Sequence, residues 1–346
     1  MFSQTTRHTS HPRPAQRGWC RRRRAHTAAL SLALALAAGA ATGLAATPAW
    51  AAGGYHITAT IGVGHNPESV AVSPDGTRAY VPNSNSNSMS VINTATHRVI
   101  ATIGVGDGPY WVAVSPDGDR VYVTNYASGT VSVINTATNR VSATIGVGNN
   151  PEGVAVSPDG THAYVTSFGS NSVVVINTAT NQVTATIGVG QLPIAIAVSP
   201  DGTRAYVANA INGSVSVINT ATNQVTATIG TGGSPFGVAV SRDGTRVYVA
   251  NWLSQTVQVI NTATNQVIAT LDVGGAPYGV AVSPDGTSAY VANGGSVFVI
   301  STAANQVTAT IRGLCNGQGI AASPDGTHLY VADDMGHGHV SVITRQ

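Results

Sequence analysis

Residues 153–187 read GVAVSPDGTHAYVTSFGSNSVVVINTATNQVTATI, and this stretch decides the fold. Short apolar, β-branched runs alternate in it with turns rich in Gly, Pro, Asn and Asp, a pattern typical of antiparallel strands. In the first turn, Pro158 presets φ, Asp159 can accept hydrogen bonds from neighbouring backbone N–H groups, and Gly160 tolerates positive φ. The stretch therefore predicts a unit of four strands, named A to D in chain order, without a helix.

This unit recurs along the chain. Its turn, Ser-Pro-Asp-Gly, has seven copies, one of them Ser-Arg-Asp-Gly, which begin at Ser73, Ser115, Ser157, Ser199, Ser241, Ser283 and Ser323. The step between copies is 42 residues, except for a last step of 40. Four-stranded units of this length are typical of β-propeller blades. We interpret the seven turn aspartates as structural residues rather than as metal ligands or acids.

The two ends of the repeat are offset. The last copy stops after its third strand, residues 340–343, and a segment that matches the missing fourth strand, residues 57–61, precedes the first copy. Pairing these two segments would close the ring and remove two exposed sheet edges. We therefore predict an all-β, seven-bladed propeller with four antiparallel strands per blade, closed by the N-terminal strand in the last blade.

The N-terminus has the pattern of a secretory signal. Four arginines at 21–24 precede an apolar stretch at about 28–46, and Ala49 and Ala51 supply the small residues of a cleavage site. We predict that residues 1–51 are removed and that residues 52–346 form a single propeller, secreted or associated with the cell envelope. A retained membrane anchor is the alternative, and both Sec and twin-arginine export remain open.

The charge of the predicted mature chain limits its partners. Residues 52–346 contain nine Arg, no Lys and 14 acidic residues, a net charge of −5. Such a chain is a poor ligand for phosphate backbones, so nucleic acid is not an expected partner. Without the signal no membrane span would remain, and we expect a monomer.

A tetrapeptide of the second strand resembles a known repeat. It reads Tyr122-Val123-Thr124-Asn125 in the second copy, and variants of it begin at Tyr80, Tyr164, Tyr206, Tyr248, Tyr290 and Tyr330. Over residues 55–346 the chain is similar to the YVTN-family β-propeller repeat proteins. This resemblance implies relatives among archaeal surface-layer and exported bacterial proteins, many without an assigned activity. Similar seven-bladed folds also serve lactone hydrolases and a streptogramin-cleaving lyase, so the resemblance fixes the fold better than the function.

Chemistry is expected where the copies differ, in the loops from D to A and from B to C, which share one face. We expect a ring at the channel mouth formed by the residues that follow the loop proline or its equivalent: Glu68, Tyr110, Glu152, Ile194, Phe236, Tyr278 and Gln318. A wider ring follows the YVTN motif: Ser84, Tyr126, Phe168, Ala210, Trp252, Gly294 and Asp334.

The aromatic residues of these loops are candidate ligand-binding residues, because exposed aromatics gathered on one face indicate recognition. They are Tyr110, Trp111, Tyr126, Phe168, Phe236, Trp252 and Tyr278. The alternative is that they cap the core under the loops.

Histidines and acidic residues form a second cluster, where the last blade meets the first. The candidate metal ligands are Asp333, Asp334, His337 and His339, and the cofactor they would bind is a divalent metal ion. The candidate catalytic residues are His65, Glu68, Glu152, His337 and His339. A solvated surface turn is the alternative for His337 and His339.

Two functions follow from these features. The first is a binding or scaffold protein that recognises a small molecule, a glycan or a protein through the loop face. The alternative is a hydrolase or lyase, lactonase-like or streptogramin-lyase-like, that acts at the channel mouth with or without a metal ion. The sequence names neither the ligand nor the substrate.

Overall fold

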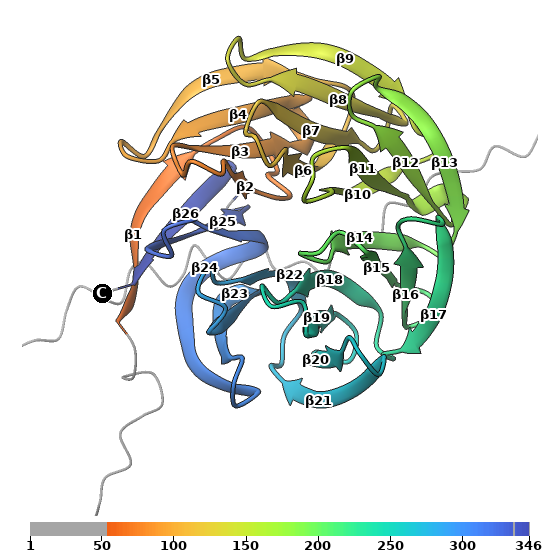
Figure 1. Cartoon of the computed structure of the whole chain (residues 1–346). Helices are drawn as coiled ribbons and strands as arrows, with labels where there is room; N and C mark the ends of the chain where they lie inside the picture. The colour runs from red at the N-terminus through yellow and green to blue at the C-terminus, as the bar shows by residue number, and fades with distance from the viewer. Residues whose placement is uncertain (1–53, 335, 346) are drawn as a thin grey trace, which may run out of the picture. The chain divides into compact units, whose positions relative to one another are not determined.

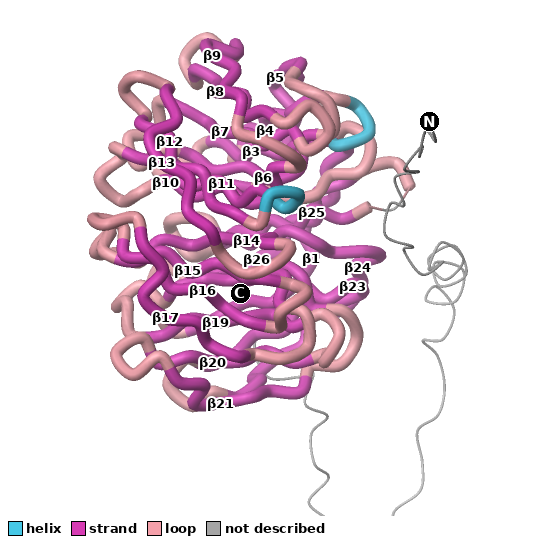
Figure 2. Tube along the Cα trace, turned by 90° about the vertical axis from the view of Figure 1, so that its right-hand side faces the viewer, coloured by secondary structure: helices cyan, strands magenta, loops and turns pink. Residues whose placement is uncertain are grey.

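The computed structural model describes residues 54–334 and 336–345, and within them the chain forms a ring of seven four-stranded antiparallel blades. Strand A of each blade lies nearest the central axis and strand D lies on the outside (Figure 1). Viewed from the side, the loops lie on the two faces of the ring (Figure 2). The predicted signal, residues 1–51, lies outside the described residues.

Five blades are separate sheets whose strands follow one another in chain order. Blade 1 comprises β2 (Ala71–Val72), β3 (Arg78–Asn83), β4 (Ser88–Asn93) and β5 (Arg98–Gly104). Blade 2 comprises β6 (Pro109–Val114), β7 (Arg120–Asn125), β8 (Thr130–Asn135) and β9 (Arg140–Gly146). Blade 3 comprises β10 (Pro151–Val156), β11 (His162–Ser167), β12 (Ser172–Asn177) and β13 (Gln182–Gly188). Blade 4 comprises β14 (Pro193–Val198), β15 (Arg204–Asn209), β16 (Ser214–Asn219) and β17 (Gln224–Gly230). Blade 5 comprises β18 (Pro235–Val240), β19 (Arg246–Asn251), β20 (Thr256–Asn261) and β21 (Gln266–Asp272). The 3₁₀ turns η1 (Ser84–Ser86) and η2 (Phe168–Ser170) lie in the B–C loops of blades 1 and 3.

Blades 6 and 7 share one continuous sheet, in the order β1-β26-β25-β24-β23-β22. Its members are β22 (Pro277–Val282), β23 (Ser288–Ser301), β24 (Gln306–Ala322), β25 (His328–Asp333), β26 (His339–Arg345) and β1 (Tyr55–Gly62). Strand β23 supplies strands B and C of blade 6, while β24 supplies its strand D and then strand A of blade 7. The two blades join because the B–C loop of blade 6 is short, so that Gly294 pairs with Gly317.

The N-terminal strand closes the ring, as the offset of the repeat predicts. Strand β1 pairs antiparallel with β26, from Tyr55 opposite Arg345 to Gly62 opposite His339. Side chains from this pair, including Ile61 and Val340, form one buried cluster with residues of blade 1. The first and last described strands therefore lie side by side (Figure 1) and join the last blade to the first.

The repeated turns have the structural role expected of them, and the repeated tyrosines are buried core residues. In blade 1, the Asp75 carboxylate accepts hydrogen bonds from Ser73 Oγ (2.5 Å) and Thr77 N (3.0 Å), and Gly76 has φ of 72°. These bonds lower the pKa of Asp75. The YVTN tyrosines are buried between blades, and Tyr80 packs in one cluster with Val112 and Val121 of blade 2. These roles explain why the copies are alike at these positions.

Candidate active site at the channel mouth

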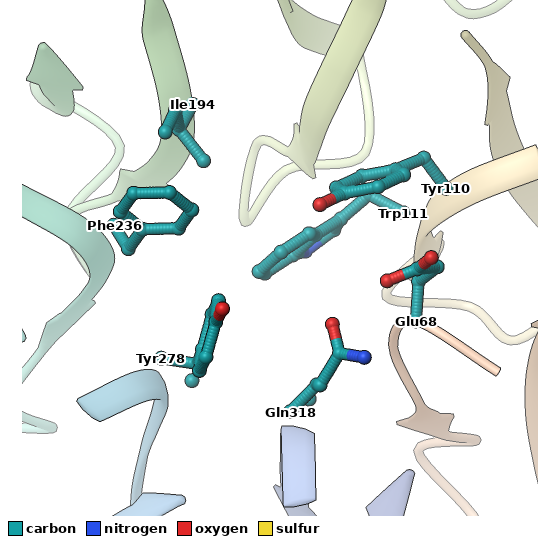
Figure 3. Close-up of a pocket in the computed structure, with 9 residues that line it drawn as sticks. Glu68, Tyr110, Trp111, Ile194, Phe236, Tyr278 and Gln318 are labelled. Atoms are coloured by element: carbon teal, nitrogen blue, oxygen red, sulfur yellow. The ribbon is translucent and has the colours of Figure 1, made fainter. Parts of the chain in front are cut away.

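The first predicted ring surrounds a narrow cavity at the start of the A strands. Six of its seven members line this cavity: Glu68, Tyr110, Ile194, Phe236, Tyr278 and Gln318. Figure 3 shows these side chains arranged around the axis. The seventh member, Glu152, is buried in blade 3 and is 7% exposed. Sevenfold repetition thus brings together residues that are spread over 250 positions of the chain, from Glu68 to Gln318.

A single tryptophan fills the centre of the ring. The next residue along strand A is small in six blades: Ser69, Gly153, Ala195, Gly237, Gly279 and Gly319. The glycines are required because neighbouring strands come close, and a Cβ atom on Gly237 would lie 2.0 Å from Tyr278 O. Blade 2 has Trp111 at this position, and its indole lies in the middle of the ring (Figure 3). The cavity volume that remains is about 10 Å³, the space of about one water molecule.

The other candidate aromatics form two groups on the same face. Tyr126 lies between Tyr110 and Phe168, with ring centroids at 6.1 and 6.2 Å. Phe236 lies between Trp252 and Tyr278, with centroids at 5.8 and 5.3 Å. These separations are typical of favourable aromatic pairs.

The six rings are partly buried, so they pack on one another and still present surface at the mouth. We name the first group, Tyr110, Tyr126 and Phe168, the blade 2–3 group, and the second, Phe236, Trp252 and Tyr278, the blade 5–6 group.

Glu68 is held in place as a hydrogen-bond acceptor. Its Oε1 atom accepts bonds from Asn66 Nδ2 (2.5 Å) and Ser84 Oγ (3.1 Å), and Asn66 Nδ2 also donates to Ser84 Oγ (2.6 Å). Asn66 has a left-handed backbone conformation, with φ of 57°, which asparagine adopts more readily than most residues. The sequence places Ser84 in the wider ring, but it does not indicate that Ser84 and Asn66 bind this carboxylate.

Glu152 is buried, as Glu68 is, with exposed fractions of 7% and 3%. The Oε2 atom of Glu152 is buried and has no hydrogen-bond partner among the described residues. Burial, and in second place the charge of Glu68, raises the pKa of Glu152 to about 8. Burial, with a smaller contribution from Glu152, also raises the pKa of Tyr126. At neutral pH Glu152 is therefore mainly protonated, and its interaction with Glu68 couples the two carboxyl groups at the mouth.

The second cluster forms where it is expected but contains separate structural contacts. Val63 N donates to Gly338 O (3.1 Å), which brings the loop of His65 beside the loop of His337 and His339. His65 and His337 are exposed. The Nδ1 atom of His339 is buried and has no hydrogen-bond partner within residues 54–334 and 336–345.

The two aspartates of this cluster serve the local backbone. Asp333 is 1% exposed, and its carboxylate accepts bonds from Cys315 N (3.0 Å) and Asn316 N (2.7 Å). Asp334 Oδ1 accepts a bond from Gly336 N (2.9 Å) inside its own loop. In the part of the chain that the structure describes, no group of three or more His, Cys, Asp or Glu residues is placed to hold a metal ion. The four candidate metal ligands are therefore not gathered into a metal centre there.

Fold and site together define a seven-bladed β-propeller with a pair of carboxyl groups and aromatic side chains at one channel mouth. The family described as "Lactonase, 7-bladed beta-propeller" matches residues 51–346, and the chain belongs to this family. Among solved structures, a chain of Kuenenia stuttgartiensis hydrazine synthase is similar with a TM-score of 0.76 and 24% identity, over 82% of this chain and 97% of that one. At this identity the likeness shows the fold alone. A comparison with curated proteins finds no match. Among the described residues no helix has the length and apolar character needed to cross a membrane.

Proposed function

We propose that the protein is a hydrolase that opens a lactone ring at the loop face, with Glu68 and Glu152 as its acid–base pair. One observation carries this proposal. The two carboxyl groups at the mouth are coupled, but Glu152 is kept protonated by burial while Glu68 accepts hydrogen bonds from Asn66 and Ser84. Titratable groups whose environments differ in this way indicate acid and base roles. Membership of the lactonase family supports the reaction class.

The reaction needs one base and one acid. Glu68 would accept a proton from a water molecule as that water attacks the carbonyl carbon of the lactone. The bond between the carbonyl carbon and the ring oxygen then breaks, and Glu152 would donate its proton to the leaving oxygen. The product is the hydroxy acid, and proton transfer from Glu68 through solvent restores Glu152. Each proton transfer of this kind typically contributes about 10²–10⁴-fold to the rate.

The aromatic residues suit a small ring as substrate. Trp111 and the first ring leave space for about one water molecule, so a lactone would lie above the indole rather than in the channel. The blade 2–3 group lies beside Glu152 and offers flat apolar surfaces to the ring carbons. Recognition by aromatics next to acidic groups is typical of small-molecule sites.

The test is a set of five- and six-membered lactones, with acid release measured after subtraction of spontaneous hydrolysis. We expect Glu152→Gln and Glu68→Gln each to lower kcat by about 10²–10⁴-fold. Asp119→Asn, which removes an exposed carboxylate on the opposite face, is the matched control and should keep full activity. Oxygen-18 from solvent should enter the product carboxylate, whereas its absence would indicate a lyase. If the wild type opens none of these lactones, the hydrolase proposal is wrong.

Recognition without catalysis is the second candidate function, and the two aromatic groups favour it. Here the same face would hold a small molecule, glycan or protein, and the carboxyl groups would serve binding alone. One experiment distinguishes the two functions. If the protein only binds its ligand, the wild type shows no turnover and Trp252→Ala weakens ligand binding. A ligand that binds the wild type and Trp252→Ala equally would count against this candidate.

Two finer assignments belong to this proposal. The first is that the repeat is of the YVTN type, on the tetrapeptides of the B strands. The second is that the protein is exported and that cleavage after Ala51 leaves residues 52–346. The mass of the protein recovered outside the cytoplasm would test the second, and a mass that includes residues 1–51 would contradict it.

A further inference from the structure

The face opposite the candidate active site carries a rim of turns that is broken at one point. In six A–B turns the proline lies against the turn glycine of the next blade. In blade 1, for example, a Cβ atom added to Gly118 would lie 3.6 Å from Cδ of Pro74. Blade 5 has Arg242 in place of proline, and only its Cβ approaches Gly286, at 3.9 Å. The rim therefore lacks one proline ring, between blades 5 and 6.

The same junction leaves a second arginine without its usual partner. In blades 1 and 4 the first arginine of strand B donates to a carbonyl of the next blade, from Arg78 Nη1 to Thr136 O (2.6 Å) and from Arg204 Nη1 to Thr262 O (2.5 Å). Arg120 makes the equivalent bond to Thr178. Arg246 Nη1 instead donates to Asn305 Oδ1, at 3.4 Å, and the guanidinium lies beside the Tyr248 hydroxyl. Its guanidinium therefore keeps donors for another group.

A cavity of about 430 Å³ opens at this junction, lined by Arg242, Arg246 and Tyr248 among others. This volume lies within the range of about 300–1,000 Å³ found for small-molecule sites. Tyr248 is 0% exposed, and its buried hydroxyl lies beside Arg246. Because the hydroxyl is covered, the two guanidinium groups are the donors that a ligand in this cavity would contact.

The charged side chains that line the cavity indicate what charge a ligand should carry. Asp243 and Asp285 also line it, and both are bound to their own turns through Ser241 Oγ (2.6 Å) and Ser283 Oγ (2.5 Å). These hydrogen bonds lower the pKa of both aspartates, which stay ionised and balance the two arginines. A singly charged carboxylate therefore fits better than a doubly charged phosphate. Arginine binds carboxylates through paired N–H donors.

We propose that this cavity binds a small monocarboxylate, with Arg242 and Arg246 on the carboxylate. The site is on the opposite face from the channel mouth, and the proposal does not depend on lactone hydrolysis. It depends on the one turn in which the repeat has arginine instead of proline.

The experiment titrates the purified protein with gluconate by calorimetry, and with inorganic phosphate as a second anion. We expect gluconate to bind more tightly than phosphate, and Arg242→Pro to weaken gluconate binding by about 10-fold or more. Arg242→Pro restores the residue of the other six turns, so its melting temperature should not fall. Arg140→Gln, which changes an exposed arginine on β9, should leave gluconate binding unchanged.

Glu152→Gln tests whether gluconate, a hydroxy acid like the proposed product, binds in this cavity rather than at the channel mouth. An affinity equal to that of the wild type supports this cavity, and a weaker affinity would place the ligand at the mouth and overturn the proposal. Equal affinity of the wild type and Arg242→Pro for gluconate would overturn the proposal. So would tighter binding of phosphate than of gluconate, or an absence of gluconate binding by the wild type.

Discussion

The two faces of the ring are built from the same 28 strand segments but differ in how far their copies diverge. On the face of the A–B turns, six copies read Ser-Pro-Asp-Gly and one reads Ser-Arg-Asp-Gly. On the face of the D–A and B–C loops, the residue at the mouth changes from Glu68 to Tyr110 to Ile194 around the ring. Uniform positions satisfy the same backbone groups in each blade, whereas varied positions are left available for a ligand. We therefore place both proposed sites of this chain where the repeat is broken.

The largest expected effect concerns closure, on which both faces depend. Deletion of residues 57–61 removes most of β1 and leaves β26 as an exposed edge. We expect the variant to lose the cooperative unfolding transition of a monomer. The free energy lost with this strand is comparable with the whole free energy of unfolding of a domain, about 5–15 kcal/mol. Calorimetry and size-exclusion chromatography would measure it. An unchanged melting profile of a monomer would show that the ring does not need this strand.

The next effect tests the close approach of strands at the mouth. Gly237→Ala places a Cβ 2.0 Å from Tyr278 O, and we expect a loss of about 3 kcal/mol in the free energy of unfolding. Gly230→Ala is the matched control, since a Cβ there meets no atom within 4 Å. Urea unfolding of both variants would measure the difference. Equal stability of the two would mean that the small inner residues are not required by packing.

A smaller effect concerns the buried acid of the loop face. The pKa of Glu152 is raised to about 8 in the folded protein, which means that the fold favours the protonated carboxyl group. The contribution of Glu152 to the free energy of unfolding is therefore fully present below the pKa of the unfolded chain, and it is lost as the pH rises toward 8. Glu152→Gln should remove this loss, so we expect its free energy of unfolding to rise relative to that of the wild type as the pH increases from 4.5 to 8. Thermal unfolding at a series of pH values measures the gap. A gap that does not change with pH would show that Glu152 ionises normally.

The smallest effect is expected on the uniform face. Asp201 accepts bonds from Ser199 Oγ (2.5 Å) and Thr203 N (3.0 Å), which lower its pKa. We expect Asp201→Asn to cost about 1 kcal/mol at pH 7. The difference should shrink as pH falls through the lowered pKa, because the wild-type carboxylate is then protonated too. Chemical unfolding at pH 7 and at acid pH checks this, and a cost that grows in acid would contradict the turn role.

The sequence predicts the fold almost completely, because each blade repeats its own turn chemistry and the termini supply complementary strands. It also predicts the six residues of the first ring that line the cavity, since a residue at a fixed place in each copy must recur around the axis. The sequence does not predict that Trp111 fills the centre of the ring. The other six blades have a small residue at this position because neighbouring strands approach closely, and this spacing is known only from the structure. The coupling of Glu68 to Glu152 depends on burial and on distance across the mouth, and neither is encoded in spacing. Asp333 looks like a metal ligand in the sequence, but its carboxylate binds backbone N–H groups of the neighbouring loop.

The most direct test of the account is the pH dependence of kcat/KM for lactone opening, which reports the ionisation of the free enzyme. Since Glu152 must be protonated to donate to the leaving oxygen, we expect kcat/KM to fall as pH rises through about 8. Asp119→Asn should follow the same curve. A rate that stays level or rises through this range, after subtraction of spontaneous hydrolysis, would contradict the assignment of Glu152 as the acid at the mouth.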